Sequence, residues 1–441
     1  MAKGAMLLAM LFLLIYLILP GAAATAQEEG TADEAQEQGA EGEAGETGSD
    51  GPPWTEQAAG QAEPPDISAE SAVLIDARSG AVLYAKNPDE PLYPASITKI
   101  VTGIIALEVA DPQDIVTVSK EARHEDGTRV YLAEGEQLTM ERLVYALMLN
   151  SGNDAATAIA EHIDGSKEAF AERMNRFVKE TVGTKNTVFK NPHGLPDPEQ
   201  HTTAADMALI ARYAMQNESF RRIVGTPSMP WSGEEWESRL VNHNKLLGTY
   251  EGATGVKNGY TNDAGFTLVG SAARGDMELI GVIMKAPNDK ALYDDMTAML
   301  DYGFASFEPM RLFSEGEQYP YLATGEDPRF QADEDIWAVV PKGETPELSV
   351  GEDGSITVKT SGGEAVAGKL RPLETAAAAS AAPEAGAAAG GAADEPARSV
   401  WKNGFMVLWL LLNVFIAWIA RRLYVRARTR KMEYAQKYWR K

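Results

Sequence analysis

The stretch Pro94-Ala-Ser-Ile-Thr-Lys-Ile-Val-Thr-Gly103 decides how this sequence is read. Its apolar residues predict the start of a helix, on which Ser96 and Lys99 stand three positions apart. Residues at i and i+3 are neighbours on a helix surface, so the hydroxyl and the amine would lie side by side. A lysine partly removed from water loses some of its preference for charge, and its neutral amine can accept a proton. Ser96 and Lys99 are therefore a candidate nucleophile and base that need no histidine.

The spacing alone carries little weight, because a helix-capping serine beside a solvated lysine would look the same. Ser399-Val-Trp-Lys402 repeats the spacing at a place where no catalysis is expected. The predicted helix N-terminus distinguishes Ser96, since its exposed N–H groups favour negative charge on a reacting oxygen. Other motifs along the chain are needed to decide between the two interpretations.

Ser151-Gly-Asn153 is the second motif. It follows a helical pattern that runs from Leu138 to Asn150, and a further helix is predicted from Asp154. Serine, glycine and asparagine are common turn residues, so the tripeptide alone is weak. Its place between two helices, however, lets a short loop direct two polar side chains inward.

Lys257-Asn-Gly259 is the third motif, and it precedes Tyr260, Thr261 and a predicted strand hairpin. A lysine at a strand edge beside glycine can hold a substrate carboxylate while the backbone passes close to it. The tripeptide recurs at Lys402-Asn-Gly404, so it also needs the context of the other motifs.

The surrounding pattern predicts an α+β domain at residues 66–305. Residues 71–76 and 81–85 read as one strand hairpin, residues 265–273 and 277–284 as a second, and residues 290–304 as a helix. Strands at both ends with helices between them are typical of this class, and the two hairpins could join one antiparallel sheet. Short β-like runs at 336–340, 348–350 and 356–359 predict a separate small β domain at residues 306–372.

A helix-borne Ser-x-x-Lys, a helix-joining Ser-x-Asn and a strand-borne Lys-x-Gly, in this order, resemble the signature of the penicillin-recognising serine enzymes. Within that group the sequence most resembles the D-alanyl-D-alanine carboxypeptidases, the low-molecular-mass penicillin-binding proteins of the peptidase S11 type. The resemblance spans about residues 66–305 and implies a β-lactamase/penicillin-binding-protein-like α+β fold, with an antiparallel sheet flanked by helices. The stretches that carry it are Leu74-Ile-Asp-Ala-Arg-Ser-Gly, Tyr93-Pro-Ala-Ser-Ile-Thr-Lys, Leu147-Met-Leu-Asn-Ser-Gly-Asn-Asp-Ala-Ala, Asn191-Pro-His-Gly-Leu and Gly255-Val-Lys-Asn-Gly-Tyr-Thr.

The resemblance implies removal of the terminal D-alanine from peptidoglycan stem peptides through an acyl-enzyme, with β-lactam antibiotics as covalent inhibitors. It implies three catalytic residues: Ser96 as nucleophile, Lys99 as base, and Ser151 as the group that passes a proton to the leaving amine. The implied substrate-binding residues are Asn153, Lys257, Asn258, Gly259, Tyr260 and Thr261, and Asn153 would also steady Lys99. The backbone N–H groups of Ser96 and Tyr260 would form the oxyanion hole.

One position departs from the family, which usually has threonine where Asn258 stands. This departure supports the alternative of a catalytically weak or inactive penicillin-binding module. A β-lactamase-like hydrolase is the other alternative, but a class A enzyme should carry a Glu-x-x-Leu-Asn loop, and none follows Asn153. A high-mass transpeptidase would normally carry a large domain ahead of Ser96, where this sequence has an acidic stretch.

Composition narrows the chemistry further. The 441 residues contain no cysteine, which excludes disulfides and thiolate catalysis. None of the five histidines lies in a His-Glu-x-x-His pattern, so we expect neither a metal nor another cofactor. His193 is expected to be structural rather than catalytic. The formal net charge of −24 should repel nucleic acid, which is not an expected partner.

The N-terminal segment reads as an export signal. Residues 1–26 combine Lys3, an apolar core and the small-residue sequence Ala24-Thr-Ala26, as expected of a signal peptide, although an uncleaved anchor would look similar. Residues 27–65 are rich in acids, glycine and alanine, and they predict a disordered linker. Residues 373–402 predict an Ala/Gly-rich linker.

The C-terminal segment predicts attachment to a membrane. The apolar run from Gly404 to Ala420 is short for a spanning helix but sufficient, and we place that helix at residues 403–421. The tail at 422–441 is rich in arginine and lysine with Glu433 as its single acid, which favours a cytoplasmic C-terminus. A buried core helix or a nucleic-acid-binding tail fits less well. The sequence therefore predicts a single-pass protein of the cell membrane with its catalytic domain outside, facing the wall.

Overall fold

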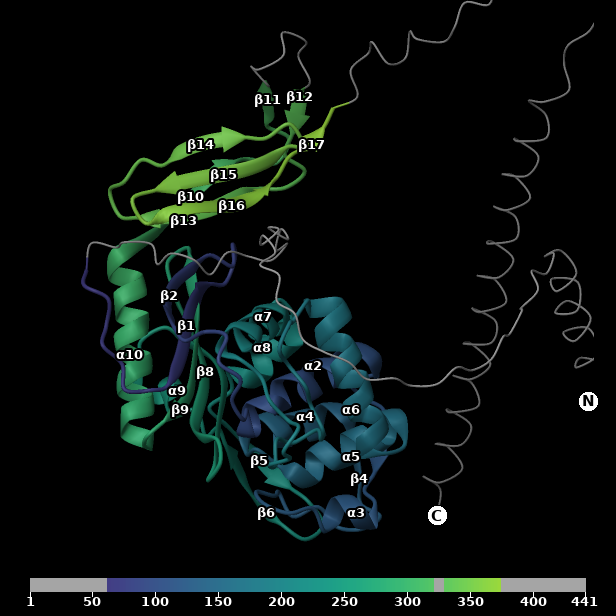
Figure 1. The fold of residues 1–441 in the computed structure, drawn as a ribbon. Helices are drawn as coiled ribbons and strands as arrows, with labels where there is room; N and C mark the ends of the chain where they lie inside the picture. Colours follow the sequence, from purple (N-terminus) through teal and green to yellow (C-terminus); the bar gives the residue numbers. More distant parts are fainter. Residues whose placement is uncertain (1–61, 321–328, 374–441) are drawn as a thin grey trace, which may run out of the picture. The chain divides into compact units, whose positions relative to one another are not determined.

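The computed structural model describes residues 62–320 and 329–373. Its centre is a five-stranded antiparallel sheet with the strand order β2-β1-β9-β8-β7 (Figure 1). The strands are β1 (Ser71–Asp76), β2 (Val82–Lys86), β7 (Ala253–Thr261), β8 (Gly265–Arg274) and β9 (Met277–Ala286). Both predicted hairpins are confirmed, and the pairing of β1 with β9 joins them in one sheet.

The sheet is covered on both faces, which explains why its inner strands are almost continuously apolar. Every residue of β1 is buried. The long helix α10 (Asp289–Ser306) packs on one side, where its Met296 and Leu300 join Leu74 and Leu279 in one core. The short helix α9 (Leu246–Thr249) lies on the same side as α10, with Leu246 in the same core. Most of the other helices gather on the opposite side of the sheet (Figure 1), and α7 (Ala204–Ala214) packs against β1 and β9. Apolar side chains removed from water on both faces stabilise this layered arrangement.

The helical part lies between the two ends of the sheet in sequence. It contains η1 (Ala95–Thr98), α2 (Lys99–Val109), α3 (Lys120–Arg123), α4 (Met140–Leu149), α5 (Asn153–Asp164), α6 (Lys167–Arg176), η2 (Phe177–Val182), α8 (Glu218–Val224) and α9 (Leu246–Thr249). Two short hairpins pair β3 (Ile115–Thr117) with β4 (Gln137–Thr139) and β5 (Ser228–Ser232) with β6 (Glu237–Val241). Helix α2 is buried along its first eight residues, as its nearly uniform apolar sequence requires.

Residues after α10 form small antiparallel sheets. Their strands are β10 (Phe307–Phe313), β11 (Gln318–Pro320), β12 (Arg329–Gln331), β13 (Ile336–Pro341), β14 (Glu347–Val350), β15 (Ser355–Thr360), β16 (Gly363–Lys369) and β17 (Arg371–Pro372). The three β-like runs predicted here are confirmed as β13, β14 and β15. Phe313, Phe330 and Ile356 lie in a separate apolar core. The domain boundaries drawn from the sequence stay predictions.

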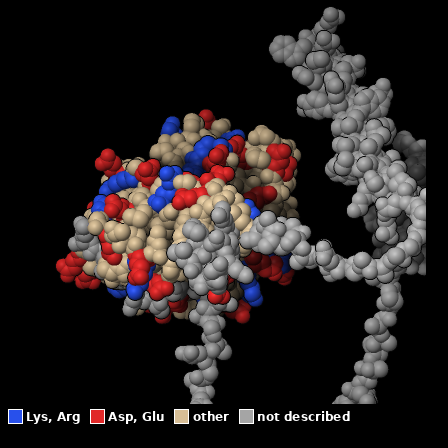
Figure 2. Space-filling model, turned by 90° about the horizontal axis from the view of Figure 1, so that it is seen from above, with Lys and Arg blue, Asp and Glu red and all other residues tan. Residues whose placement is uncertain are grey.

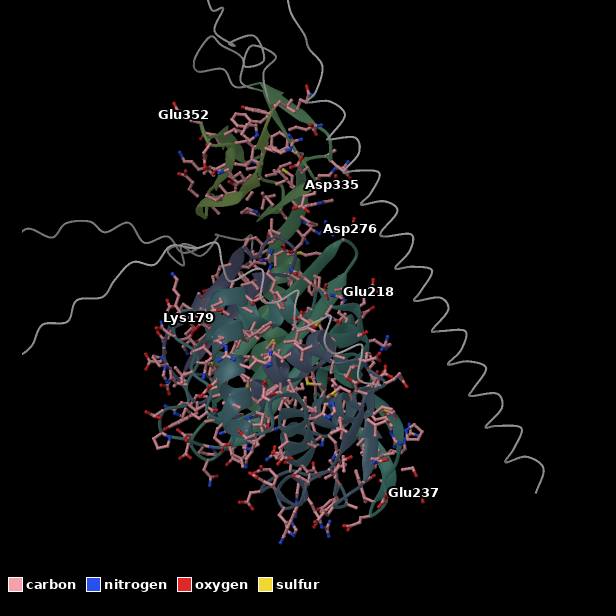
Figure 3. The ribbon with its side chains drawn as sticks, turned by 90° about the vertical axis from the view of Figure 1, so that its right-hand side faces the viewer. Lys179, Glu218, Glu237, Asp276, Asp335 and Glu352 are labelled. Carbon is pink, nitrogen blue, oxygen red and sulfur yellow. The ribbon has the colours of Figure 1, made fainter. Side chains whose placement is uncertain are left out.

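On the face of the molecule that Figure 2 shows, charged side chains do not segregate by sign. Lysine and arginine are interspersed with aspartate and glutamate on the face shown in Figure 2, and acids such as Glu218, Glu237 and Glu352 lie on separate parts of the molecule (Figure 3). Within residues 62–320 and 329–373, no helix combines the length and the apolar character needed to cross a bilayer. The predicted segments 1–26, 403–421 and 422–441 lie outside the described residues.

Candidate active site

Ser96 and Lys99 lie together at the start of the buried helix α2. The predicted helix is confirmed, but its first turn is the 3-10 helix η1, which contains Ser96, and the α-helical part begins at Lys99. The Nζ atom of Lys99 lies 3.0 Å from Oγ of Ser96. The two groups are thus within the distance that direct proton transfer requires.

Lys99 is completely buried, and this burial changes its acid–base behaviour. Its Nζ atom has a second contact, with the carbonyl oxygen of His193 at 2.7 Å. Burial lowers the pKa of Lys99 well below its ordinary value, and the positive charge of Lys257 lowers it further, whereas the carboxylates of Asp154 and Glu125 act in the opposite direction. The neutral amine, which can accept the Ser96 proton, therefore forms more easily at Lys99 than at a solvated lysine.

Lys257 lies on β7, an outer strand of the central sheet, and only 1% of it is exposed. Its Nζ atom donates to the carbonyl oxygen of Asn258 at 2.9 Å and to Oδ1 of the same residue at 3.4 Å. Burial lowers the pKa of Lys257 to about 7. The amine has neutral oxygens beside it rather than an acid, so an incoming carboxylate would supply the missing negative charge.

Gly259 brings β7 into direct contact with the segment that carries Ser96. A Cβ atom at this position would lie 2.6 Å from the backbone N of Ser96 and 2.7 Å from Oγ1 of Thr267. Thr267, on β8, also donates a hydrogen bond to the carbonyl oxygen of Pro94 at 3.0 Å. The absence of a side chain at Gly259 thus lets the sheet and η1 meet at the nucleophile.

A second glycine, Gly194, lies against the same segment. Gly194 has a positive φ of 92°, and a Cβ atom there would lie 1.9 Å from the carbonyl oxygen of Ala95. The loop that contains Asn191-Pro-His-Gly-Leu is therefore packed against the backbone beside Ser96. Lys99, whose amine reaches the His193 carbonyl, lies between this loop and η1.

The Ser151-Gly-Asn153 motif forms the turn between α4 and α5, as predicted. Ser151 is 5% exposed and has a φ of 58°, a left-handed conformation that is uncommon for serine and is maintained by its surroundings. Asn153 donates its backbone N–H to Thr128 and its side-chain Nδ2 to the carbonyl oxygen of Asp126 at 2.6 Å. The predicted contacts of Asn153 with substrate and with Lys99 stay predictions.

Tyr260 and Thr261 lie where β7 turns into β8. Tyr260 is 53% exposed, its hydroxyl donates to Oδ1 of Asn262, and its ring lies against Phe266 with 4.4 Å between ring centres. The Thr261 hydroxyl accepts the N–H of Ala264 at 3.1 Å. Thr261 is thus held by the turn, with its hydroxyl proton still available for a further bond.

Two histidines near the lysines have no predicted site role. The His193 ring is buried, in agreement with a structural role, but its backbone carbonyl touches Lys99. The pattern of side chains could not predict this contact, because a backbone carbonyl makes it. The Asn-Pro-His-Gly-Leu stretch was the available signal that this loop belongs near the site. His243 is exposed as a whole residue, although its ring is partly removed from water. This burial, and after it the positive charges of Lys257 and Lys99, lowers the pKa of His243 to about 4.

Known sequences resemble a large part of this chain. The sequence model of the family described as D-alanyl-D-alanine carboxypeptidase matches residues 58–288, just over half of the chain. The D-alanyl-D-alanine carboxypeptidase DacF of Bacillus subtilis is 39% identical over 256 residues, which cover 56% of this chain and 65%, just under two thirds, of DacF. The D-alanyl-D-alanine carboxypeptidase DacD of Escherichia coli is 32% identical over 302 residues, which cover 65% of this chain and 77% of DacD.

Solved structures share the fold. Penicillin binding protein 5 from Haemophilus influenzae has a TM-score of 0.61 and 29% identity, over 70% of this chain and 99% of that protein. The Streptomyces K15 DD-transpeptidase has a TM-score of 0.53 and 29% identity, over 55% of this chain and all of that protein. The predicted penicillin-binding-protein-like α+β fold is therefore confirmed. The chain belongs to the D-alanyl-D-alanine carboxypeptidase family, the serine hydrolases of the peptidase S11 type.

Proposed function

We propose that this chain is a serine-type D-alanyl-D-alanine carboxypeptidase, which removes the terminal D-alanine from peptidoglycan stem peptides and is inhibited by penicillins. The observation that carries the proposal is the buried Lys99 amine 3.0 Å from the Ser96 hydroxyl. Membership of the family and the names of its relatives support the substrate class. The contact between Gly259 and the Ser96 backbone supports a substrate site along β7.

Acylation would begin at Ser96. Its Oγ attacks the carbonyl carbon between the two D-alanines while the neutral Lys99 amine accepts the hydroxyl proton. The N–H groups of Ser96 and Tyr260 donate to the negative oxygen that develops on that carbonyl. Donors of this kind contribute about 3–4 kcal/mol each in comparable sites. The result is a tetrahedral intermediate bonded to Ser96.

Breakdown of this intermediate needs a proton on the departing nitrogen, and we assign that role to Ser151. Its hydroxyl gives a proton to the D-alanine nitrogen as the peptide bond breaks and takes up the proton that Lys99 received from Ser96. The shortened peptide is left as an ester on Ser96, and the Lys99 amine is neutral again. Water then hydrolyses the ester and restores the serine. A penicillin follows the same first step, and its acyl group stays on Ser96.

Substrate recognition would centre on the terminal carboxylate. The Lys257 ammonium attracts it, with Asn258 and Thr261 as additional donors, while Asn153 binds a peptide carbonyl of the substrate. Because a bound carboxylate favours the charged form of Lys257, binding would restore the proton that burial makes easy to lose.

The experiment that tests this function uses the full chain in detergent and a pentapeptide that ends in D-Ala-D-Ala. Mass spectrometry should show loss of one alanine with the wild type and no loss with Ser96→Ala. An intact peptide with wild-type protein would exclude the carboxypeptidase. A product joined to an added amine would instead indicate a transpeptidase.

Labelling with fluorescent penicillin distinguishes the two alternative functions, a catalytically weak or inactive module and a β-lactamase-like hydrolase. The departure at Asn258 is the observation that favours the weak module. Stable labelling of the wild type with no peptide hydrolysis would identify that module, whereas rapid release of the label would identify a β-lactamase-like enzyme. A labelled Ser96→Ala variant would contradict the assignment of the nucleophile.

A further inference from the structure

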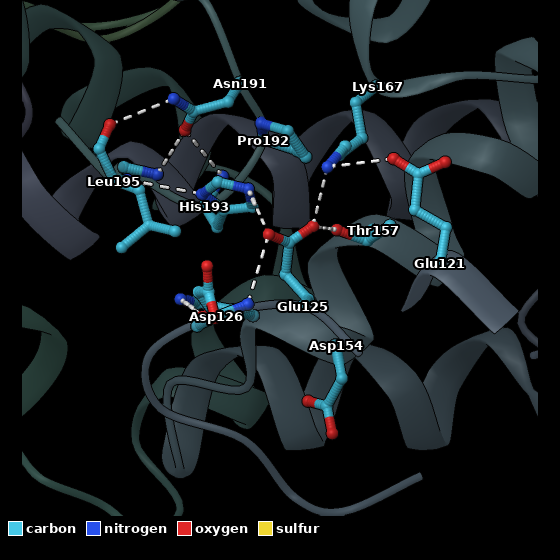
Figure 4. A network of polar contacts seen from close by, with 12 residues as sticks. Glu121, Glu125, Asp126, Asp154, Thr157, Lys167, Asn191, Pro192, His193 and Leu195 are labelled. Carbon is cyan, nitrogen blue, oxygen red and sulfur yellow. Dashed lines mark hydrogen bonds and ion pairs between the residues drawn. The ribbon is translucent and has the colours of Figure 1, made fainter. Parts of the chain in front are cut away.

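Glu125 belongs to a buried polar network beside the active site (Figure 4). It lies in the loop between α3 and β4, and 9% of it is exposed. One carboxylate oxygen accepts hydrogen bonds from the Thr157 hydroxyl at 2.7 Å and from Lys167 Nζ at 2.9 Å. The other oxygen lies 3.6 Å from Nε2 of His193, an electrostatic contact that is too long for a hydrogen bond. Burial alone would raise the pKa of Glu125, but the contacts with His193, Lys167 and Thr157 outweigh it, so the group stays charged.

The His193 ring has a hydrogen bond at Nδ1 and the Glu125 carboxylate as a polar neighbour at Nε2. Nδ1 accepts the N–H of Leu195 at 3.2 Å, so the neutral ring carries its proton on Nε2, which lies toward Glu125. Burial lowers the pKa of His193, which favours this neutral form. The N–H of Gly194 also donates to Asn191 Oδ1 at 2.7 Å. Ring and turn together fix the backbone carbonyl of His193, which accepts the hydrogen bond from Lys99.

We propose that Glu125 is a positioning residue for Lys99: it holds His193 so that the His193 carbonyl keeps the Lys99 amine directed at Ser96. A neutral amine has two N–H groups and one lone pair. When one N–H donates to the carbonyl, the amine can turn its lone pair to the Ser96 hydroxyl. Without that acceptor, the flexible four-carbon stem of lysine could place the amine elsewhere. The inference rests on the proposed function, in which Lys99 is the base.

The charges around Lys99 and Glu125 predict how the pH dependence of acylation changes when the Glu125 charge is removed. Lys99 senses Lys257 on β7, Asp154 on α5 and Glu125, and the two carboxylates favour its ammonium form. Glu125 itself is near Lys167, His193 and Glu161, and Lys167 also pairs with Glu121. Removal of the Glu125 charge should lower the pKa of Lys99 further. Because only the neutral amine accepts a proton, the acidic limb of the rate profile should then move to lower pH.

The test measures the rate at which fluorescent penicillin acylates Ser96 in the full chain, from pH 5 to pH 9. Glu125→Gln keeps the shape of the side chain and removes its charge. We expect its maximal rate to fall by about ten- to a hundredfold, as small displacements of a catalytic group do, and its acidic limb to move to lower pH.

Glu136→Gln is the matched control. Glu136 is also buried, at 3% exposed, and it belongs to the same loop, but its carboxylate accepts N–H groups of Ala133 and Glu234. We expect this variant to acylate like the wild type once rates are scaled to the folded fraction. An equal loss in both variants with unchanged acidic limbs would overturn the positioning role and leave a structural one.

His193→Asn keeps the backbone carbonyl and removes the ring, so it decides the matter if Glu125→Gln does not fold. We expect a similar loss of rate, and a double variant no slower than the slower single one, because both changes act through the same link. A folded His193→Asn with the wild-type rate would overturn the inference. Wild-type protein that never labels would overturn both the inference and the proposed function. A labelled wild type with an unaffected Glu125→Gln would overturn the inference alone.

Discussion

At the scale of single residues, the proposed mechanism gives two buried lysines opposite tasks. Lys99 must lose its proton to act as base, whereas Lys257 must keep its proton to hold a carboxylate. Burial lowers the pKa of both, and the charge of Lys257 lowers the pKa of Lys99 further. The charge on Lys257 therefore helps to deprotonate Lys99, which favours activity in the pH range where the two amines differ in charge.

Substrate affinity should fall as pH rises. With a pKa of about 7 in the free enzyme, Lys257 is charged below that pH and loses its charge above it. We expect the KM for a D-Ala-D-Ala peptide to increase from pH 6 to pH 9. Lys257→Gln should raise KM about ten- to a hundredfold, since it removes a charge-assisted hydrogen bond, and should abolish this rise. A wild-type KM that does not change with pH would show that the carboxylate is held elsewhere.

In the proposed mechanism, Asn258 shares the substrate carboxylate with Lys257. Its Oδ1 lies 3.4 Å from Lys257 Nζ, which leaves the amide nitrogen as a donor for substrate. Asn258→Thr restores the usual family residue, and we expect kcat/KM for the peptide to stay equal or to rise. Steady-state kinetics on both proteins measure this. A large decrease would identify asparagine as a specialised part of this site.

At the scale of elements, the site depends on contact between β7 and η1. Motif spacing predicted the helix that carries Lys99, the turn at Ser151 and the strand at Lys257, because each depends on local periodicity. The close approach of Gly259 to Ser96, and the path of the loop that presents the His193 carbonyl, depend on tertiary packing. Glu125 stands in no motif, and its contacts with the buried Thr157 and with Lys167 become visible only in the folded protein. The 3-10 turn at Ser96 could likewise not be predicted from the sequence, which indicated a regular helix start.

Gly259→Ala should show whether the contact between β7 and η1 affects the acylation rate as well as the free energy of unfolding. The added methyl would lie 2.6 Å from the Ser96 backbone, which has little freedom to move. We expect a stability loss of about 1–3 kcal/mol, typical of overpacking, and at least a tenfold slower acylation by penicillin. Gly248→Ala is the control, because a Cβ atom at Gly248 meets nothing within 4 Å. Equal acylation rates in the two folded variants would contradict the importance of this approach.

At the scale of the whole molecule, the distribution of charge along the chain indicates how it would lie across a membrane. The chain has a net charge of −24, although its last twenty residues are strongly basic. This separation favours an acidic exported part and a cytoplasmic tail on opposite sides of a membrane. We therefore propose attachment by a spanning helix at residues 403–421, with the catalytic domain facing the wall.

Protease protection tests this topology. Protease added outside intact cells should degrade the exported part and leave a tag at the C-terminus intact, since the membrane would shield residues 422–441. Cells permeabilised with detergent provide the control in which the tag is lost. Rapid loss of the tag from intact cells would reverse the proposed orientation.

The two glycines beside Ser96 also limit how this protein could escape a β-lactam drug. Resistance by added bulk requires space that the natural substrate does not need, yet a methyl at Gly194 or Gly259 would collide with the enzyme's own backbone before it met the drug. We expect tolerated resistance substitutions to occur at exposed positions such as Tyr260, where new side chains have room. The segment that carries the nucleophile therefore leaves little room for larger side chains at Gly194 and Gly259.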